Sequence, residues 1–140
     1  MELLHVNYKE EAIELIEGME KCLLAMGDNF NDAVLIEDIF RNMHTLKGNS
    51  AMFGFKVIAD FTHRLESVYE LIRSGDIKIS KQISNVTFSA LEHLTILVEN
   101  GNVLSEANAK SHKDLSEKIV EIIQNTTGKK KQQKNSPEKK

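Results

Sequence analysis

A lysine and a glycine lie about one helical turn after a histidine. Lys47 stands three residues after His44, and Gly48 stands four residues after it, so a helix would present all three on one face. An imidazole can act as a nucleophile, and an ammonium group one turn away can balance the charge of incoming phosphoryl oxygens. A glycine inside a helix costs about 1 kcal/mol relative to alanine, and here it leaves space beside the imidazole. The segment therefore indicates a phosphate-accepting site.

The spacing alone leaves a second interpretation of these residues open. The inward stripe of the same segment, at Met43, Leu46 and Ser50, places His44 at its edge, where the imidazole would be partly exposed. In this second interpretation Gly48 only permits close packing between helices, and His44 is an ordinary surface residue.

A carboxylate on the following segment can reach His44 if the two segments form a helical hairpin. His44 lies ten residues before Gly54 and Glu66 lies eleven after Phe55, so both would lie about 15 Å from the bend. His63, three residues before Glu66, would share its face. A carboxylate that accepts the Nδ1 proton of His44 would fix the tautomer and leave Nε2 as the free nucleophile. We therefore expect Glu66 to orient and activate His44.

Five helices are expected to position these groups, because glycines divide the chain into segments of helical length and apolar residues recur every three or four positions. The first apolar stripe covers residues 8–26 and the second residues 35–50, with Asn31 or Asp32 as the N-cap. The third stripe covers 58–72 and should end at Gly75. The fourth covers 83–98 behind a Ser80 cap, and the fifth helix should begin between Ser105 and Ser111.

Short connections between these helices force neighbours to run antiparallel. The fold class is therefore predicted as all-α, an antiparallel up-down-up-down four-helix bundle with an additional C-terminal fifth helix packed outside it or extending it. We expect residues 1–125 to form this domain. Residues 126–140 hold six lysines against one glutamate and no apolar anchor, and they are predicted to form a basic, disordered linker or tail.

Composition excludes several classes of function. The chain of 140 residues is 41% hydrophobic and lacks the apolar run of a membrane span or signal peptide, so we expect a soluble cytoplasmic domain without membrane insertion. The part before residue 129 carries a net charge of −8 against −3 for the whole chain, which argues against a nucleic-acid partner. A single cysteine, Cys22, on an apolar stripe is expected to be a buried structural thiol.

Metal binding and intrinsic catalysis find little support in the sequence. The chain has five histidines, but no Glu-x-x-His pair repeats, so no metal site is predicted. Glu92 and His93 are expected to form a solvated pair beside an apolar stripe. There is no glycine-rich phosphate loop and no nucleotide-binding α/β pattern, so we expect neither an enzyme nor a resident cofactor.

The motif around His44 also resembles that of a known family. The run HTLKGNSAMFGF, residues 44–55, fits the HxxKGxSxxxG pattern of histidine phosphotransfer (HPt) domains. With FRNM before it and FTHRLESVYELIRSG at residues 61–75, it resembles the N-terminal phosphotransfer domain of chemotaxis histidine kinases of the CheA type. One departure is Ala51, where the family often has a second glycine.

The resemblance implies a role for each residue of the motif and names the partners. His44 would be the phosphoacceptor, Glu66 its hydrogen-bond partner, Lys47 and His63 supporting residues, and Gly48 the residue that gives access. The donor would be a histidine-kinase catalytic domain that binds ATP and Mg, and the acceptor an Asp of a response-regulator receiver domain. The domain itself is expected to be monomeric. A stand-alone phosphorelay protein and a non-catalytic helical adaptor remain as alternatives.

Overall fold

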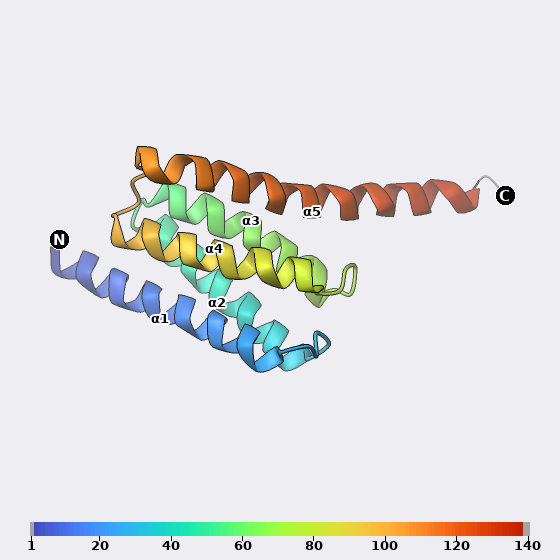
Figure 1. Cartoon of the computed structure of the whole chain (residues 1–140), viewed down its shortest axis with the longest axis horizontal. Coiled ribbons are helices and arrows are strands. Elements are labelled where there is room, and N and C mark those ends of the chain that lie inside the picture. The colour runs from blue at the N-terminus through green and yellow to red at the C-terminus, as the bar shows by residue number, and fades with distance from the viewer. Residues whose placement is uncertain (1, 139–140) are drawn as a thin grey trace.

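The structure, a computed structural model, describes the backbone of residues 2–138 and the side chains of residues 6–126. Its described backbone contains five α-helices and no strand, which confirms the predicted all-α class (Figure 1). The helices are α1 (Glu2–Met26), α2 (Ala33–Met52), α3 (Lys56–Arg73), α4 (Lys81–Glu99) and α5 (Glu106–Glu138).

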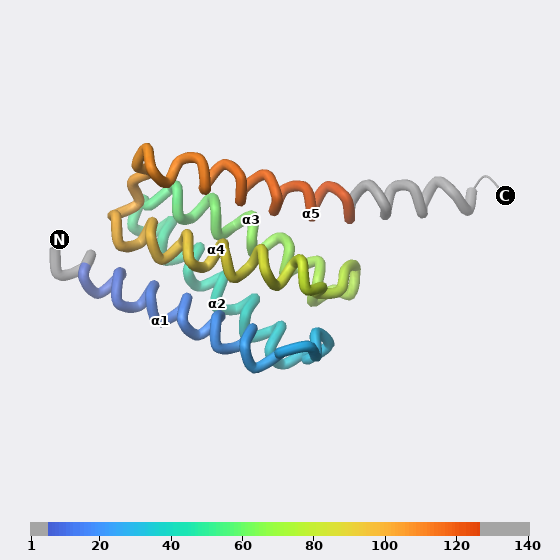
Figure 2. Tube along the Cα trace, in the orientation of Figure 1, coloured from blue at the N-terminus to red at the C-terminus, as the bar shows by residue number. Residues whose placement is uncertain are grey.

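The first four helices alternate in direction and form a closed ring. Each of α1 and α3 packs against both α2 and α4, and α5 lies outside the ring against α3 and α4 (Figures 1 and 2). The predicted up-down-up-down bundle with an outer fifth helix is therefore confirmed. Side chains after residue 126 lie outside the described residues, so the expected change from domain to tail at residues 125–126 stays a prediction.

Side-chain caps and left-handed glycines define the helix ends that sequence reasoning expected. The Leu35 amide donates to Oδ1 of Asp32 at 3.1 Å, and the Ile83 amide donates to Oγ of Ser80 at 3.2 Å. Gly75, with φ of 86°, ends α3 in the left-handed region that lacks a steric penalty only for glycine. These local signals fix where α2 and α4 begin and where α3 ends.

The core is built from the predicted apolar stripes. The residues that are fully or almost fully buried come from four helices and from the middle of α5, and include Met19, Ile39, Met43, Leu46, Phe61, Leu65, Leu91, Leu94 and Ile119. The one polar position of the α2 stripe is satisfied, because the hydroxyl groups of Ser50 and Tyr8 lie 2.6 Å apart in the core. This pair of hydroxyl groups joins α1 to α2 inside the core.

Two expectations of the composition analysis can be compared with the described residues. Cys22 is half-buried, and burial, followed by the negative charges of Asp38 and Asp32, raises the pKa of its thiol. A protonated thiol is a poor nucleophile, in keeping with a structural role. No helix of the described chain is long and apolar enough to cross a membrane.

Candidate functional site

His44 and Glu66 meet across the α2–α3 hairpin. The Nδ1 atom of His44 lies 2.6 Å from Oε2 of Glu66. The His44 side chain is 64% exposed, whereas that of Glu66 is only 8% exposed. The hairpin geometry expected from the sequence therefore brings a buried carboxylate against one edge of an imidazole whose remaining surface faces solvent.

Lys47 contacts the second oxygen of the same carboxylate. Its Nζ lies 2.7 Å from Oε1 of Glu66. Burial alone would raise the pKa of Glu66, but the hydrogen bonds and positive charges of Lys47 and His44 outweigh burial and hold this pKa below its ordinary value. Glu66 is therefore ionised at neutral pH, and both of its oxygens are occupied.

The ionised carboxylate decides which nitrogen of His44 carries the proton. A carboxylate only accepts hydrogen bonds, so at 2.6 Å the neutral imidazole must donate its Nδ1 proton to Glu66. The lone pair of the neutral ring then resides on Nε2, on a side chain that is mostly exposed. The arrangement presents a nucleophilic nitrogen to an incoming group, and the hydrogen bond from Nδ1 to Glu66 fixes the tautomer of the ring.

Gly48 has no packing role. A Cβ atom built on it would meet no heavy atom within 4 Å, whereas a Cβ on Gly18 would lie 3.0 Å from Nδ2 of Asn42. Gly18 is thus the glycine at which α1 and α2 approach closely. The interpretation of Gly48 as a close-packing residue is wrong, and the surface one turn after His44 is open.

His63 lies on α3 one turn before Glu66, as the sequence predicted. Its side chain is exposed and makes no hydrogen bond or ion pair among residues 6–126, while its carbonyl oxygen accepts a bond from Oγ of Ser67 at 3.0 Å. The structure does not join His63 to the contacts of His44, Lys47 and Glu66, and its supporting role stays a prediction.

Phe40 lies beside His44 and Arg73 lies against Phe40, and sequence reasoning assigned neither of them to the site. The rings of Phe40 and His44 are stacked, with centroids 6.3 Å apart and planes 16° apart. The guanidinium carbon of Arg73 lies 4.3 Å from the Phe40 centroid. The available signal was spacing, because Phe40 precedes His44 by one turn and Arg73 follows Glu66 by two turns on its face.

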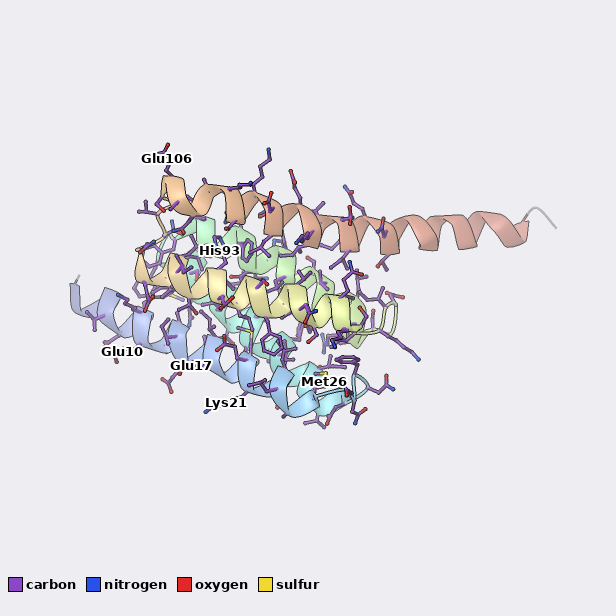
Figure 3. All side chains as sticks on the ribbon, in the orientation of Figure 1. Glu10, Glu17, Lys21, Met26, His93 and Glu106 are labelled. Carbon is purple, nitrogen blue, oxygen red and sulfur yellow. The ribbon has the colours of Figure 1, made fainter. Side chains whose placement is uncertain are left out.

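Away from this site, His93 of α4, labelled in Figure 3, contacts His112 of α5. The expected solvated Glu92–His93 pair is wrong, because His93 is only 3% exposed and its Nε2 lies 2.9 Å from Nδ1 of His112. Burial, followed by the charge of His112, lowers the pKa of His93 to about 4. Sequence reasoning missed this contact because it depends on how α5 docks. Among the described residues no group of three or more histidine, cysteine or acidic side chains is placed to hold a metal ion.

Comparison with known proteins identifies the family. The model of the Hpt domain matches residues 4–126. The chain belongs to the Hpt domain family. Over 91 residues it is 37% identical to the chemotaxis protein CheA of Bacillus subtilis. The matched residues make up 65% of this chain and 14% of that protein. This Hpt chain therefore spans a small part of the relatives that it matches.

Solved structures share the fold of this Hpt domain. The CheA phosphotransferase domain from Thermotoga maritima is 29% identical, with a TM-score of 0.67 over 69% of this chain and 92% of that chain. The phosphorylated P1 domain of CheA3, solved in complex with CheY6 from R. sphaeroides, is 24% identical and has a TM-score of 0.75, covering 87% of this chain and 99% of that one.

Proposed function

We propose that this Hpt domain is a phosphocarrier of a chemotaxis-type two-component system. His44 accepts the γ-phosphoryl group of ATP from a separate kinase catalytic domain and passes it to an Asp of a response-regulator receiver domain. The observation that carries the proposal is the position of Glu66, which accepts the Nδ1 proton at 2.6 Å and leaves Nε2 as the nucleophile.

The first transfer forms a bond between Nε2 and the γ-phosphorus. The bond from that phosphorus to the β,γ-bridging oxygen breaks, and ADP leaves with this oxygen. Nδ1 keeps its proton throughout, and the positive charge that develops on the ring is balanced by the Glu66 carboxylate. In the second transfer an aspartate oxygen attacks the phosphorus, the N–P bond breaks, and the ring returns to its neutral form.

Lys47 balances charge on the phosphoryl oxygens in this proposal. Phosphoryl transfer passes through a loose transition state, so it depends chiefly on positioning and charge compensation. The Lys47 side chain is 27% exposed, and in this proposal its ammonium group turns from Glu66 toward a phosphoryl oxygen on Nε2. Open space at Gly48 admits the partner that delivers or removes the group.

The relatives support the identity of the partners. One neighbour was solved phosphorylated and in complex with CheY6, and the curated relatives include CheA proteins several times longer than this chain. We therefore infer that the parent protein is a cytoplasmic histidine kinase whose own catalytic domain binds ATP and Mg. The domain acts as a monomeric acceptor with no cofactor of its own. A stand-alone phosphorelay protein would use the same site.

The direct test is phosphorylation by a chemotaxis-kinase catalytic core and radiolabelled ATP. We expect about one acid-labile phosphoryl group per chain, mapped to His44, and no label on the His44→Gln variant. Circular dichroism should show that this variant keeps its helices, because the side chain is mostly exposed. A helical adaptor bundle predicts instead that neither protein is labelled, and label that persists on His44→Gln would assign the acceptor to another histidine.

A further inference from the structure

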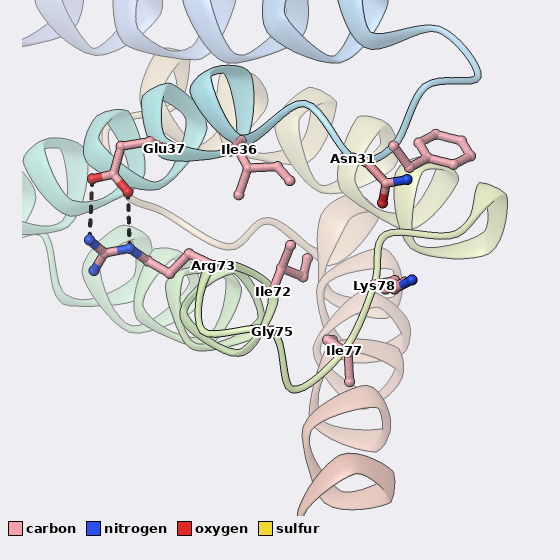
Figure 4. A pocket seen from close by; sticks show the side chains of 10 residues that line it. Asn31, Ile36, Glu37, Ile72, Arg73, Gly75, Ile77 and Lys78 are labelled. Carbon is pink, nitrogen blue, oxygen red and sulfur yellow. Dashed lines mark hydrogen bonds and ion pairs between the residues drawn. The ribbon is translucent and has the colours of Figure 1, made fainter.

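One face of the α2–α3 hairpin carries a connected row of side chains beside His44. Nε and Nη2 of Arg73 lie 3.1 and 3.3 Å from the two carboxylate oxygens of Glu37, which joins α3 to α2 (Figure 4). Nη1 of Arg73 lies 3.4 Å from Oε1 of Glu70. The guanidinium group held in this way lies 4.3 Å from the Phe40 centroid, and Phe40 is stacked with His44.

The contact with Glu66 does not by itself hold the plane of the imidazole. A single hydrogen bond fixes the distance between Nδ1 and the carboxylate, but the ring can still tilt about that bond. The His44 side chain is 64% exposed, so few other atoms oppose the tilt. A helical side chain leans over the preceding turn, and there the His44 ring lies nearly parallel to the Phe40 ring, with planes 16° apart and centroids 6.3 Å apart.

We propose that Phe40, held by the Arg73–Glu37 fork, is a positioning residue that keeps the His44 ring in the plane required for transfer. This inference rests on the proposed function. Phe40 limits the tilt, Glu66 fixes the tautomer, and together they direct the Nε2 lone pair outward. A misaligned lone pair lowers the rate even when the nucleophile is present, because transfer needs a near-linear approach to phosphorus.

The chemistry of the fork explains the use of arginine at position 73. A guanidinium group is planar and binds a carboxylate through two parallel bonds while its face lies against an aromatic ring. Its two glutamate partners accept three hydrogen bonds from it, so Arg73 serves as a brace for Phe40 rather than as a free cation. The fork also borders a hollow of about 300 Å³ that is lined in part by Ile36 and Ile72.

The test combines a spectroscopic measurement with a labelling rate. Long-range 1H–15N NMR correlations of the His44 ring report which nitrogen carries the proton and how mobile the ring is, without any kinase. Phosphoramidate, a small donor that phosphorylates histidine with loss of ammonia, then reports the reactivity of Nε2 without a docking partner. Labelling by the kinase core is measured last, on the same proteins.

Four variants distinguish a positioning role of Phe40 from a general packing role and from an effect of the Arg73 charge. Phe40→Leu removes the flat ring, Phe40→Tyr keeps it, and Glu37→Gln loosens the fork while leaving both rings in place. Phe88→Leu is the matched control, because Phe88 is a half-buried aromatic residue of α4 that packs against the core away from α2.

We expect Phe40→Leu to slow labelling by both donors about three- to tenfold and to increase the mobility of the His44 ring. Phe40→Tyr should restore both properties, Glu37→Gln should give a smaller loss of the same kind, and Phe88→Leu should match the wild type. Wild-type rates and an unchanged His44 spectrum in Phe40→Leu would overturn the inference. Faster labelling of Glu37→Gln would also overturn it, because a released Arg73 would then be acting as a charge.

The two proposals fail in different ways. If the kinase core does not label the wild-type domain, the proposed function fails, while the NMR spectra and phosphoramidate rates still decide the role of Phe40. If Phe40→Leu loses its helical structure, Glu37→Gln, which changes a side chain that is 40% exposed, carries the test alone.

Discussion

The Glu66 carboxylate accepts from two donors, His44 and Lys47, with one oxygen each, and this division makes it sensitive to a change as small as Glu66→Gln. A glutamine has one acceptor oxygen and one donor amide. If its oxygen accepts from Lys47, its amide hydrogens face Nδ1 of His44, which favours the tautomer with the proton on Nε2 and removes the nucleophilic lone pair. We expect labelling to slow by about ten- to a hundredfold without vanishing, the range of a charge-assisted hydrogen bond.

The rate of His44 labelling in Glu66→Gln is best compared with that in Glu92→Gln, which makes the same change on the exposed face of α4. Long-range 1H–15N correlations should report a larger fraction of the Nε2–H tautomer in the first variant alone. Wild-type labelling together with a wild-type tautomer ratio would show that Glu66 is dispensable to the imidazole.

Gly48 offers a second test at the scale of single residues. A β-branched side chain there begins in open space in the isolated domain, because a Cβ atom has no contact within 4 Å. Valine also has a higher helix propensity than glycine. Gly48→Val should therefore leave the melting temperature unchanged or slightly raised, while it slows labelling by the kinase core about tenfold or more by obstructing the space beside His44.

Thermal denaturation and labelling of the same Gly48→Val sample provide the measurement. Gly18→Ala serves as the comparison, because its Cβ lies 3.0 Å from the Asn42 side chain and this neighbour must move. Parallel losses of stability and transfer in Gly48→Val would return Gly48 to a packing role.

At the scale of helices, the hairpin of α2 and α3 was predictable because its signals are local. The apolar stripes, the Asp32 cap and the turn at Gly54 fix where each helix lies, and equal distances from the turn place His44 opposite Glu66. The row from Phe40 to Glu37 was not predictable in the same way. It depends on side-chain rotamers and on how α3 is rotated about its own axis against α2. Sequence periodicity predicts which face of a helix points inward, but it does not fix this rotation more closely.

The docking of α5 was the least predictable feature. Its stripe is weak, with Ile119 alone fully buried while Leu115, Ile122 and Ile123 are partly exposed, so the sequence could not say which bundle face it covers. That choice decides the environment of His93. A histidine next to a glutamate is usually solvated, but here α5 buries it against His112.

The His93–His112 contact should make the stability of the domain depend on pH. Burial lowers the pKa of His93 to about 4 in the folded protein, and burial also lowers the pKa of His112, whereas an unfolded histidine titrates near 6.5. The unfolded chain therefore binds more protons between about pH 6.5 and pH 4. Stability is fully present above pH 6.5 and is lost as the pH falls through this window. The melting temperature should drop by about 5 °C or more between pH 7 and pH 5.

His93→Gln should flatten this pH dependence, because an amide does not titrate. His63→Gln is the matched control, since the His63 side chain is exposed, and it should keep the wild-type slope. Melting curves at several pH values check both. Equal slopes in His93→Gln and wild type would place the pH dependence in other groups.

For the whole molecule, the site and the outer helix occupy different parts of the bundle. His44 lies on α2, which contacts α1 and α3, whereas α5 covers α3 and α4. A protein that docks over His44 therefore meets an uncovered surface of the hairpin and does not have to displace α5. The proposed exchange of a phosphoryl group with two partners in turn would use such a surface, with the four-helix ring behind it supporting His44 and Glu66.

The same arrangement predicts what the isolated domain cannot do. Every chemical group at the site belongs to an acceptor: a nucleophilic nitrogen, a carboxylate that fixes its tautomer, and one ammonium group. Among the described residues no glycine-rich loop cradles a triphosphate and no acidic cluster is placed to hold a divalent cation. We therefore expect the purified domain with ATP and Mg to release no phosphate above background and to carry no label, while addition of the kinase core in catalytic amounts brings labelling close to one phosphoryl group per chain. Phosphate release and acid-labile label, followed over time with His44→Gln as the blank, provide the measurement. Stoichiometric label on His44 before the kinase core is added would mean that the domain binds ATP itself, and the division between a catalytic donor and a passive acceptor would have to be abandoned.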